Sequence, residues 1–578
     1  MRARGFEIGP DEFGVTISFE GREIVARKGE TLAAALTASG ISDYRSTASG
    51  DTRGLFCGMG VCQECLLEVD GRPNQRACMT KVAPAMTVRR QVPAPEAFGR
   101  PAPARGSTPD WQQVSDEPDI LVVGGGAGGL TAAAVAAEAG ARVVLVDERP
   151  VPGGQFFKQP ITTLGGVAAS IEDGQAADGR KLIARARDAG VAFLDAMVWA
   201  ASSPHEVHIQ DASGNRALRP KQLIVATGAY ERGVPVPGWT LPGVMTTGAA
   251  QTLLRSYRVL AGRRVLVAGN GPLNLQVAAE LAEAGGQVVG VAELAFQPGP
   301  ATLGAAWRMF MAAPDLVKQG RRYLRTLKSA DVSLHYRHVL TGIAQTESGL
   351  SASLTHLAGG TVRTFEADAV LMGYGFMPSN ELLRLLGCAH DYDAGRRHLV
   401  TRRDDDCCTT IAGVFAVGDC CGLGGARAAQ AEGVMAGLAA AGETGCTIPA
   451  GLAKEGLVAR TDLARQRRFQ SALWQLFAAD LPGLADDADD TVICRCEDQT
   501  LGDLAASLQS GFQSLGELKR CTRLGMGRCQ GRYCAPALAE YLHRTYGRAL
   551  DEFAYFAPRP PIKPIGIGDM VQQDERTT

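Results

Sequence analysis

One pattern occurs twice along this chain and limits its possible folds more than any other feature. It consists of an apolar strand, a glycine-rich turn, an alanine-rich helix and a second apolar strand, near residues 120–147 and again near residues 264–293. Such a run is typical of a dinucleotide-binding β-α-β unit, in which the helix packs on a parallel sheet. We therefore expect an alternating α/β core with two of these units between Asp119 and about Gly442.

Charge and hydropathy exclude several classes of function. The 59 Lys and Arg residues nearly balance the 61 Asp and Glu residues, so no overall positive field attracts nucleic acid. No apolar run reaches the roughly 18 residues of a transmembrane helix, and the start, MRARGFEIGP, lacks the apolar core of a signal peptide. We expect a cytoplasmic protein without a transmembrane segment, with peripheral attachment to the inner membrane as the alternative. In that reducing compartment the 15 cysteines are not expected to form disulfides.

Four cysteines near the N-terminus have the spacing C-x4-C-x2-C-x12-C: Cys57, Cys62, Cys65 and Cys78. Three thiolates in one loop and a fourth across a hairpin suit a [2Fe-2S] cluster. Gly58 and Gly60 suit a loop that folds closely around a cluster. The spacing resembles the plant-type ferredoxin loop with a shortened last interval, as in the iron–sulfur subunit of succinate dehydrogenase. A zinc site or buried structural cysteines are the alternatives, but zinc usually takes paired C-x2-4-C knuckles.

The first glycine turn reads G-x-G-x-x-G at Gly124, Gly126 and Gly129. In such a turn the first glycine permits the tight bend, the second lets the backbone approach a pyrophosphate, and the third lets the helix pack on the strand. The helix N-terminus adds positive potential. Asp147 ends the second strand, where an acid binds ribose hydroxyls. The sequence predicts a bound dinucleotide, and a glycine turn without a ligand is the alternative.

Two distant segments resemble the return motifs of flavoproteins that have two dinucleotide-binding domains. These are KQLIVATGAY, with Ala226, Thr227 and Gly228, and GVFAVGDCCGLGG, with Gly418 and Asp419. In those flavoproteins the aspartate of the second motif binds the ribityl chain. The resemblance implies FAD in the first nucleotide site.

The second glycine turn is less regular than the first. Gly269 and Gly271 are present, but Asn274 replaces the third glycine and Pro272 removes a backbone donor. Glu293 ends the following strand and would favour an unphosphorylated ribose, as in NAD. An NAD site and a retained fold without a nucleotide are equal alternatives. The core has no C-x-x-C, which excludes the chemistry of the flavoprotein disulfide reductases.

A second set of cysteines, near the C-terminus, has the spacing C-x-C-x32-C-x4-C: Cys494, Cys496, Cys529 and Cys534. This spacing resembles the [2Fe-2S] domain of bacterioferritin-associated ferredoxin, with ligands in two loops at helix starts, where backbone N–H groups stabilise thiolates. Zinc is the alternative, since two cysteine pairs suit either metal. Cys521 lies outside the spacing and is not expected to be a ligand. None of the 8 histidines has an acid or nucleophile beside it in a motif, so no catalytic residue is assigned.

Several longer segments together resemble one family. They are ERPVPGGQFFKQP, ATGAYERGVPVPGWTLPGVMTTGAAQTLL, GYGFMPSNELLRLLGC, GVFAVGDCCGLGGARAAQAEG and the CRCE and GMGRCQGRYC motifs. The family comprises the α-type subunits of heteromeric amino-acid-oxidising flavoenzymes: hydrogen cyanide synthase, opine oxidase, dye-linked proline or hydroxyproline dehydrogenase and sarcosine oxidase. The ferredoxin unit, separate in some relatives, is fused here. The resemblance adds four candidate cofactor-binding residues: Ala127, Glu148, Gly154 and Gln155.

The expected fold is multidomain: an α+β ferredoxin-like unit, an α/β flavoprotein core with two dinucleotide-binding domains, and a small helical domain like bacterioferritin-associated ferredoxin. The expected parts are the [2Fe-2S] ferredoxin-like domain (13–95), a linker (96–117), the FAD-binding domain (118–260 and 365–445), the NAD-binding-like domain (261–364), a helical connector (446–490), the C-terminal [2Fe-2S] domain (491–546) and an extended tail (547–578).

The family resemblance implies an electron-transfer subunit of a flavin and iron–sulfur oxidoreductase that acts on CH–NH or CH–NH2 donors. A β-type, FAD-containing partner would oxidise an opine, proline, hydroxyproline, sarcosine or glycine. An FMN between the subunits is a further candidate, and a quinone, a dye or a carrier protein would accept the electrons. Intact Gly271 and Glu293 favour an alternative, a self-sufficient NADH-dependent FAD and iron–sulfur reductase. A third possibility is ATP or NAD as a structural ligand in the first site.

Overall fold

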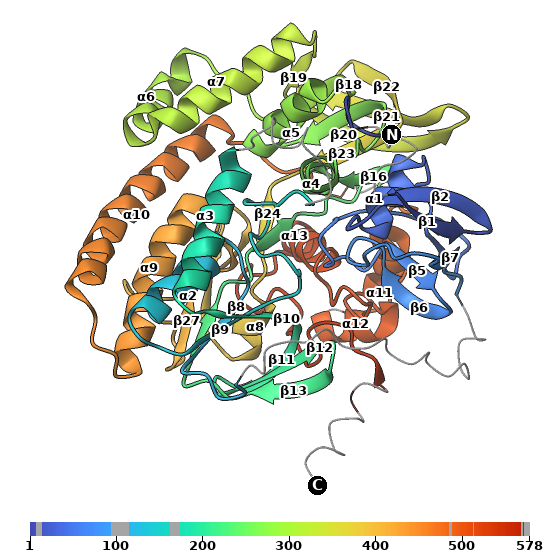
Figure 1. Ribbon diagram of the computed structural model, residues 1–578. Helices are drawn as coiled ribbons and strands as arrows, with labels where there is room; N and C mark the ends of the chain where they lie inside the picture. The colour runs from blue at the N-terminus through green and yellow to red at the C-terminus, as the bar shows by residue number, and fades with distance from the viewer. Residues whose placement is uncertain are drawn as a thin grey trace.

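Figure 1 shows the chain as a computed structural model, in which the first and last structural units lie side by side. The structure describes residues 1–6, 14–93, 115–161, 174–484, 488–512, 514–567 and 570. Most of the expected linker, and the last part of the expected tail, lie outside the described residues.

The N-terminal unit is a mixed sheet with one helix packed on it. Its elements are β1 (Gly14–Phe19), β2 (Arg22–Arg27), α1 (Leu32–Ala38), β3 (Arg45–Ser46), β4 (Thr52–Arg53), β5 (Leu66–Val69), β6 (Arg72–Arg76) and β7 (Thr87–Arg90). The main sheet has the order β2-β1-β7-β5-β6, with β1 and β7 parallel. Alternate residues of β1, Val15, Ile17 and Phe19, are buried, as expected for a strand with one face in the core.

The first nucleotide-binding unit is built on a parallel sheet. Its elements are β8 (Ile120–Val123), α2 (Ala127–Glu138), β9 (Val143–Asp147), α3 (Gly174–Asp188), β10 (Ala192–Asp195), β11 (Met197–Ser203), β12 (Glu206–Asp211), β13 (Gly214–Leu218), β14 (Gln222–Val225), β27 (Val414–Ala416) and α9 (Ala426–Glu443). The sheet has the order β10-β9-β8-β14-β27. One face packs on α2 and α9, and the other packs on β11, β12 and β13. Burial on both faces explains the continuous apolar runs of β8 and β9.

The second nucleotide-binding unit repeats this plan. Its elements are β16 (Val244–Thr246), α4 (Thr247–Tyr257), β17 (Arg264–Gly269), α5 (Pro272–Glu283), β18 (Gln287–Glu293), β19 (Leu334–Tyr336), β20 (His338–Thr346), β21 (Gly349–His356), β22 (Val362–Ala367) and β23 (Ala369–Gly373). The parallel sheet has the order β16-β23-β17-β18-β19. Strands β16 and β23 fall outside the expected range 261–364, so this unit takes in chain on both sides of it. The reason is that β23 pairs with the central strand β17, and β16 pairs with β23 at the edge of the sheet.

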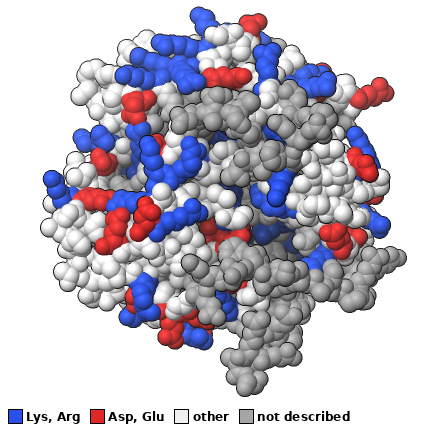
Figure 2. All heavy atoms as spheres, viewed as in Figure 1, with Lys and Arg blue, Asp and Glu red and all other residues white. Residues whose placement is uncertain are grey.

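Short elements join the two units, and three helices cover their outer side. The short elements are β15 (Ala229–Glu231), β24 (Phe376–Pro378), α8 (Glu381–Leu385), β25 (His390–Asp393) and β26 (His398–Thr401), and the outer helices are α6 (Leu303–Ala312), α7 (Pro314–Ser329) and α10 (Ala450–Leu476). Helix α6 packs on α10 through Met309, Phe469 and Ala472. Figure 2 shows Lys and Arg gathered at the top of this face, where Figure 1 places α6 and α7.

The C-terminal unit consists of β28 (Val492–Cys494), β29 (Gln499–Thr500), α11 (Leu501–Gln509), α12 (Leu515–Thr522) and α13 (Cys534–Tyr546). Helices α11 and α12 each begin with a capping box, Thr500 with Asp503 and Ser514 with Glu517. The following tail crosses the first nucleotide-binding unit, where the Ile562 N–H donates to the Trp199 carbonyl at 2.8 Å. Among the helices of the described residues, none combines the length and the hydropathy that a transmembrane span requires.

The N-terminal unit is part of the protein core and does not stand apart on its linker. Its buried side chains share one apolar cluster with α4 and α5 of the second unit. The Thr246 N–H, at the start of α4, donates to the Phe56 carbonyl at 2.9 Å. A Cβ at Gly58 would lie 3.0 Å from the Cα of Ala249, so the cysteine loop fits closely against this helix.

Candidate functional site

The three glycines of the first turn, between β8 and α2, have different surroundings. Gly124 has a φ of +108°, and a Cβ there would lie 2.4 Å from the Ala226 carbonyl oxygen. A Cβ at Gly129 would lie 1.9 Å from the Gly124 carbonyl oxygen, so glycine is what allows α2 to pack this closely. A Cβ at Gly126 would meet no protein atom within 4 Å. This open space at a helix N-terminus is suited to a phosphate group.

The acid at the end of β9 holds the glycine turn in place. Asp147 accepts the Gly125 N–H on Oδ2 at 2.6 Å and the Arg149 N–H on Oδ1 at 2.8 Å. Burial raises the pKa of the Asp147 carboxyl group. The carboxylate therefore organises the turn from within and lines the space in front of it.

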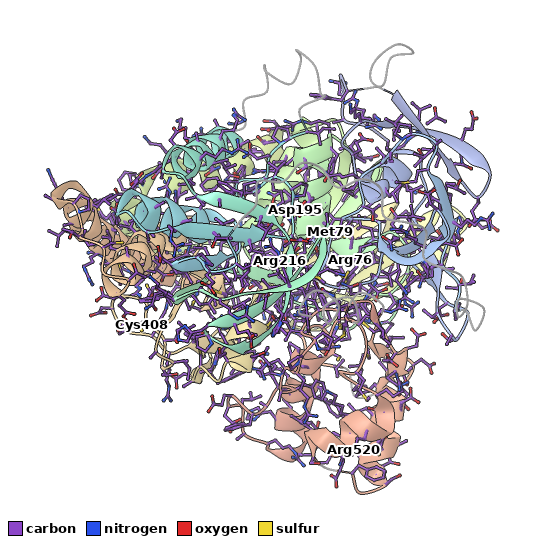
Figure 3. All side chains as sticks on the ribbon, turned by 60° about the horizontal axis from the view of Figure 1, so that its bottom comes forward. Arg76, Met79, Asp195, Arg216, Cys408 and Arg520 are labelled. Carbon is purple, nitrogen blue, oxygen red and sulfur yellow. The ribbon has the colours of Figure 1, made fainter. Side chains whose placement is uncertain are left out.

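Glu148 joins three parts of the chain. Its carboxylate pairs with Arg76 of the N-terminal unit at 3.4 Å and with Lys563 of the tail. Burial opposes ionisation, but Lys563 and Arg76 outweigh it and lower the pKa of Glu148 to about 2. Burial and the negative charges of Asp147 and Glu148 raise the pKa of Asp195, which is labelled in Figure 3, to about 6.

A cavity of about 770 Å³ runs from the first glycine turn to the second. Its volume lies in the range of about 300–1,000 Å³ that is usual for cofactor sites. Most of the predicted cofactor residues line it: Gly124, Gly126, Ala127, Asp147, Glu148, Gly154, Gln155, Ala226, Thr227, Gly228, Gly271, Glu293, Gly418 and Asp419. Gly129 and Gly269 lie behind the wall, where the absence of a side chain lets backbone segments approach each other.

Asp419 lies in the cavity wall, in the turn that follows β27, and contacts the residues just ahead of α9. Its Oδ1 accepts the N–H groups of Gly424 at 3.0 Å and Gly425 at 2.8 Å. Burial raises the pKa of this carboxyl group. A carboxylate fixed in this way, beside a helix N-terminus, is placed to accept hydrogen bonds from ligand hydroxyl groups.

The second glycine turn is held differently from the first. The Asn274 side chain is 1% exposed; its Nδ2 donates to the Gly373 carbonyl at 2.8 Å, and its Oδ1 accepts the Thr247 hydroxyl at 2.9 Å. Asn274 thus ties α5 to the sheet, where a third glycine would allow close packing. Pro272 is the first residue of α5. The N–H group at this position has no partner within a helix, so the proline removes no hydrogen bond that α5 needs.

The acid of the second site is engaged by its own loop. Glu293 is 1% exposed and accepts hydrogen bonds from the Gly271 and Ala295 N–H groups and from Asn270 Nδ2, at 2.8 to 3.0 Å. Asn270 Nδ2 also donates to the Phe477 carbonyl at 3.0 Å, beyond the end of α10. The open face of Gly271 nevertheless belongs to the shared cavity.

Two buried ionisable groups line the cavity that sequence reasoning did not single out. Lys158 Nζ donates to Gln251 Oε1 at 2.9 Å, and burial lowers its pKa to about 7. Glu231 accepts the Gly248 N–H on Oε2 at 2.8 Å, while its buried Oε1 has no partner. Burial raises the pKa of Glu231 to about 7. Both residues lie in the quoted family motifs, but nothing in the motifs indicated that they would be buried.

The four N-terminal cysteines are buried and arranged as two pairs. The Cys57 and Cys62 thiols are within hydrogen-bonding reach of each other, as are those of Cys65 and Cys78. The Met59 and Cys62 N–H groups approach Cys57 Sγ at 3.5 and 3.4 Å. Burial raises the pKa of Cys57, but these hydrogen bonds outweigh it and lower the pKa. Backbone donors aimed at sulfur are typical of iron–sulfur loops.

The four C-terminal cysteines line one small cavity of about 10 Å³, together with Arg495 and Tyr533. They also form two pairs, Cys496 with Cys529 and Cys494 with Cys534. Two buried donors at this cavity, Arg495 Nε and the Tyr533 hydroxyl, have no hydrogen-bond partner in the protein. Such donors suit an acceptor bound among the thiols. Cys521 is exposed and lies elsewhere.

The pairing bears on the choice between zinc and iron. A structural zinc needs four ligands around one point, whereas a two-iron cluster takes two thiolates at each iron. Each tetrad presents its thiols as two such pairs.

The two tetrads, from opposite ends of the chain, meet each other and the large cavity. Cys62 and Glu64 line the small cavity of the C-terminal cysteines. On the other side, Cys57, Met59 and Gly60 line the large cavity. Sequence spacing gave no sign of this contact, because it depends on how the N-terminal unit docks.

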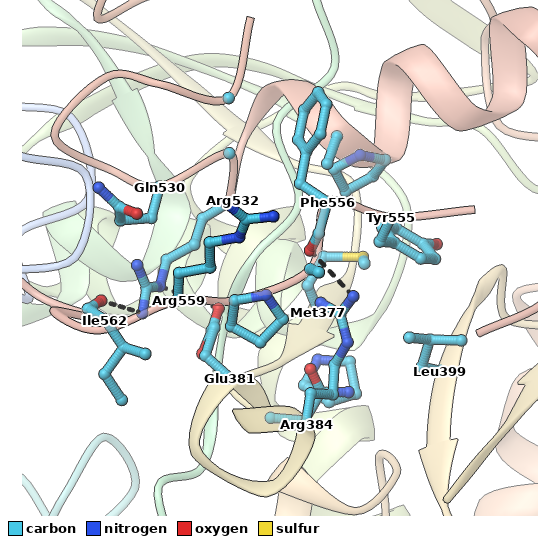
Figure 4. Close-up of a pocket in the computed structure, with 18 of the residues that line it drawn as sticks. Met377, Glu381, Arg384, Leu399, Gln530, Arg532, Tyr555, Phe556, Arg559 and Ile562 are labelled. Carbon is cyan, nitrogen blue, oxygen red and sulfur yellow. Dashed lines mark hydrogen bonds and ion pairs between the residues drawn. The ribbon is translucent and has the colours of Figure 1, made fainter. Parts of the chain in front are cut away.

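A further small cavity, of about 40 Å³, lies between the C-terminal unit, the tail and the short elements β15, β24, α8 and β26 that join the two nucleotide-binding units. Figure 4 shows Arg532 and Arg384 in its wall. Arg532 Nε pairs with Glu381 at 2.9 Å and its Nη2 donates to the Ile562 carbonyl at 3.1 Å, while Arg384 Nη2 donates to the Phe556 carbonyl at 2.9 Å. The two bonds of Arg532 hold the loop between Cys529 and Cys534 against α8 and the tail, and the bond of Arg384 holds the tail against α8.

Comparison with protein families divides the chain into three matched regions. Residues 118–433 match the pyridine nucleotide-disulphide oxidoreductase family, residues 14–93 match a 2Fe-2S iron-sulfur cluster binding domain, and residues 489–573 match the sarcosine oxidase A3 domain. The expected order of three units is confirmed at this level: an N-terminal 2Fe-2S domain, then an FAD-binding pyridine nucleotide-disulphide core, then a C-terminal unit, which matches an A3 domain.

Similar proteins include the opine oxidase A-chain of Agrobacterium tumefaciens (strain Ach5), 31% identical over 79% of this chain and 92% of that protein. The HcnB component of hydrogen cyanide synthase from Pseudomonas aeruginosa is 30% identical over 77% of this chain and 96% of that protein. Among solved structures, L-proline dehydrogenase from P. horikoshii has a TM-score of 0.69 at 19% identity, over 97% of this chain and 98% of that one, which is a likeness of fold.

The alpha component of sarcosine oxidase from Corynebacterium sp. (strain U-96) is 28% identical over 65% of this chain, and the match spans 38% of that longer protein. The expected resemblance is thereby confirmed. The chain belongs to the pyridine nucleotide-disulphide oxidoreductase family and, within it, to the α-type subunits of heteromeric oxidases that include those of opine oxidase, hydrogen cyanide synthase and sarcosine oxidase, with a 2Fe-2S domain at its N-terminus.

Proposed function

We propose that this chain is the electron-transfer subunit of a heteromeric dehydrogenase or oxidase that holds FAD and two [2Fe-2S] clusters. The observation that carries the proposal is the place of the N-terminal cysteine loop, which lines both the large cavity and the small cavity of the second tetrad. When bound, the flavin exchanges two electrons and each cluster one. A flavin in the large cavity and a cluster at each tetrad would therefore be neighbours, which favours a role in electron transfer over a role in substrate binding.

The residues proposed to hold FAD fit its pyrophosphate, its adenosine ribose and its ribityl chain. Gly126 leaves space at the N-terminus of α2, and Asp147 lies at the end of β9 beside it. Asp419 would accept hydroxyl groups of the ribityl chain. Lys158 and the unpartnered Glu231 Oε1 would face the part of the ligand nearest the Cys57 loop. ATP or NAD as a structural ligand in the first site is the alternative.

The proposed metal ligands are the two cysteine tetrads: Cys57, Cys62, Cys65, Cys78, Cys494, Cys496, Cys529 and Cys534. The pairing of the thiols supports iron at both. For the C-terminal unit we propose a domain like bacterioferritin-associated ferredoxin. We also propose the division into domains given above, with β16 and β23 added to the second nucleotide-binding unit.

The proposed reaction is the oxidation of a secondary amine or an amino acid by a separate β-type flavoprotein. This substrate class is supported by the proteins to which the chain is similar: opine oxidase, sarcosine oxidase, hydrogen cyanide synthase and L-proline dehydrogenase. An FMN between the subunits is part of the proposal. A quinone, a dye or a carrier protein would accept the electrons.

The experiment compares the purified chain with its complex. We expect the isolated chain to oxidise no opine, proline, hydroxyproline, sarcosine or glycine, and the complex with a co-encoded β-type flavoprotein to reduce a dye with one of them. Oxidation of such a substrate by the isolated chain, or none by the complex, would contradict the proposal.

A self-sufficient NADH-dependent reductase is the second candidate. The cavity supports it, because the open Gly271 shares the same space as the first site. The engagement of Glu293 by Asn270, Gly271 and Ala295 speaks against it, since a ribose would have to compete for that carboxylate. NADH oxidation by the isolated chain distinguishes the two candidates.

We propose a cytoplasmic location, with peripheral attachment to the inner membrane as the alternative. The side chains of Leu303, Trp307 and Met311 on α6 are 63–67% exposed, next to a basic α7. This pattern would suit a surface with anionic lipids. Flotation of the chain with anionic but not neutral vesicles would favour the alternative.

A further inference from the structure

The wall between the two cysteine tetrads contains a buried arginine. Arg495 stands between Cys494 and Cys496 in the sequence, and its side chain is 3% exposed. Its guanidinium lies 3.9 Å from the centre of the Phe56 ring and 4.8 Å from that of Trp239. Phe56 directly precedes Cys57 of the other tetrad. The arginine of the C-terminal motif is thus packed against the N-terminal motif.

Arg495 is held firmly in this place. Its Nη1 donates to the Trp239 carbonyl, and the Trp239 indole N–H donates to the Val492 carbonyl at 2.7 Å. The ring of Phe56 also packs edge-on against Trp239 and Tyr533, with centroids 5.7 and 5.3 Å apart. A cation fixed by two aromatic rings and a carbonyl has little freedom to turn away from the tetrads.

In the described part of the chain, no carboxylate near Arg495 is available to neutralise its charge alone, because Glu64 also pairs with Arg45. The Nε of Arg495 lies 3.7 Å from Glu64 Oε1, and neither atom has a hydrogen-bond partner. The other oxygen of Glu64 pairs with Arg45 at 3.2 Å. Arg53, which is also buried, pairs with Asp498 at 2.7 Å. One carboxylate between two guanidinium groups leaves an excess positive charge beside both tetrads.

We propose that the buried positive charge of Arg495 raises the midpoint potentials of both iron–sulfur clusters at once. The inference rests on the proposed function, because it requires iron at both tetrads. A cluster held by four thiolates becomes more negative by one charge on reduction, and nearby charge and hydrogen bonding set its potential. A positive charge at low dielectric stabilises that added charge far more than the same charge in water.

The sign of the effect can be tested from both directions. Removing the charge in Arg495→Gln should lower both midpoint potentials, and Arg495→Lys should lower them less, because the charge remains while the planar contact with Phe56 is lost. Removing the opposite charge in Glu64→Gln should raise both. Arg523→Gln is the matched control: its side chain is 60% exposed and pairs at 2.6 Å with Glu497, next to Cys496. Screening by water should leave both potentials unchanged there.

The experiment is a redox titration of the full chain followed by EPR, after the iron and zinc content of each variant has been measured. The supporting result is a downward shift of both cluster signals in Arg495→Gln and an upward shift of both in Glu64→Gln. A shift of only one signal, or of neither, at full iron content would overturn the inference. If Arg495→Gln does not fold, Glu64→Gln alone decides the sign. Zinc in the unaltered C-terminal site would instead overturn the second cluster of the proposed function, and the inference with it.

Discussion

Alanine substitution at two neighbouring glycines separates ligand binding from folding. Gly126 has a φ of −80°, which alanine adopts readily, and its added Cβ would meet no protein atom within 4 Å. In Gly129→Ala the Cβ would lie 1.9 Å from the Gly124 carbonyl oxygen, so backbone must move. We expect Gly126→Ala to leave the unfolding free energy of the apoprotein within about 1 kcal/mol, and Gly129→Ala to lower it by about 3 kcal/mol.

Nucleotide affinity, in contrast to stability, should fall in Gly126→Ala. If a pyrophosphate approaches the backbone at Gly126, the methyl group of Gly126→Ala would meet the ligand at a cost of about 1–3 kcal/mol, or about 5- to 150-fold in affinity. Calorimetric titration of the apoprotein with FAD, ATP and NAD measures the affinity and identifies the ligand together. Unchanged affinity of Gly126→Ala for whichever nucleotide binds would refute the assignment of this turn.

Three further predictions test other parts of the site. Asp419→Ala should release flavin without changing the iron content, measured on the purified chain, because the eight proposed cluster ligands lie in other units; full flavin retention would exclude its role. Cys62→Ser and Cys529→Ser should each remove a different one of two EPR signals in the reduced chain, and loss of neither would exclude two clusters. Because burial lowers the pKa of Lys158 from 10.5 to about 7, the unfolded chain binds more protons than the folded one between those values. The stability of the apoprotein contributed by this group should therefore rise with pH from about 7 to 10.5; Lys158→Met should flatten that rise in denaturant unfolding, and the exposed Lys181→Met should not.

The local parts of the fold could be predicted because their causes lie close together in the sequence. The turn at Gly124, the packing at Gly129 and the acid at Asp147 all belong to one β-α-β unit, and their spacing is set by the length of one helix. The same holds for the loop of Cys57 and Cys62. Family resemblance then indicated the order of the larger units.

The assembly of the parts could not be predicted because it depends on contacts between distant segments. Nothing near Phe56 shows that it will pack against Tyr533, and the limits of the second unit depend on the pairing of β16 with β23. A linker at 96–117 predicts that the ferredoxin-like unit is a separate domain, yet apolar residues such as Ile17 and Leu36 share a core with α4. A variant that lacks residues 1–95 would therefore expose that core to water. The single substitution Cys62→Ser is the better test of the N-terminal cluster, because it leaves the core in place.

The central claim is that electrons reach this chain from a partner flavoprotein and not from NADH. The most direct measurement is the EPR intensity of both clusters after anaerobic mixing, first of the complex with its amine substrate and then of the isolated chain with NADH. The account predicts that both cluster signals appear in the complex within its turnover time and that NADH leaves the isolated chain oxidised. Reduction of the isolated chain by NADH at rates on the order of 10 per second, typical of enzymes, with no cluster reduction in the complex, would contradict it.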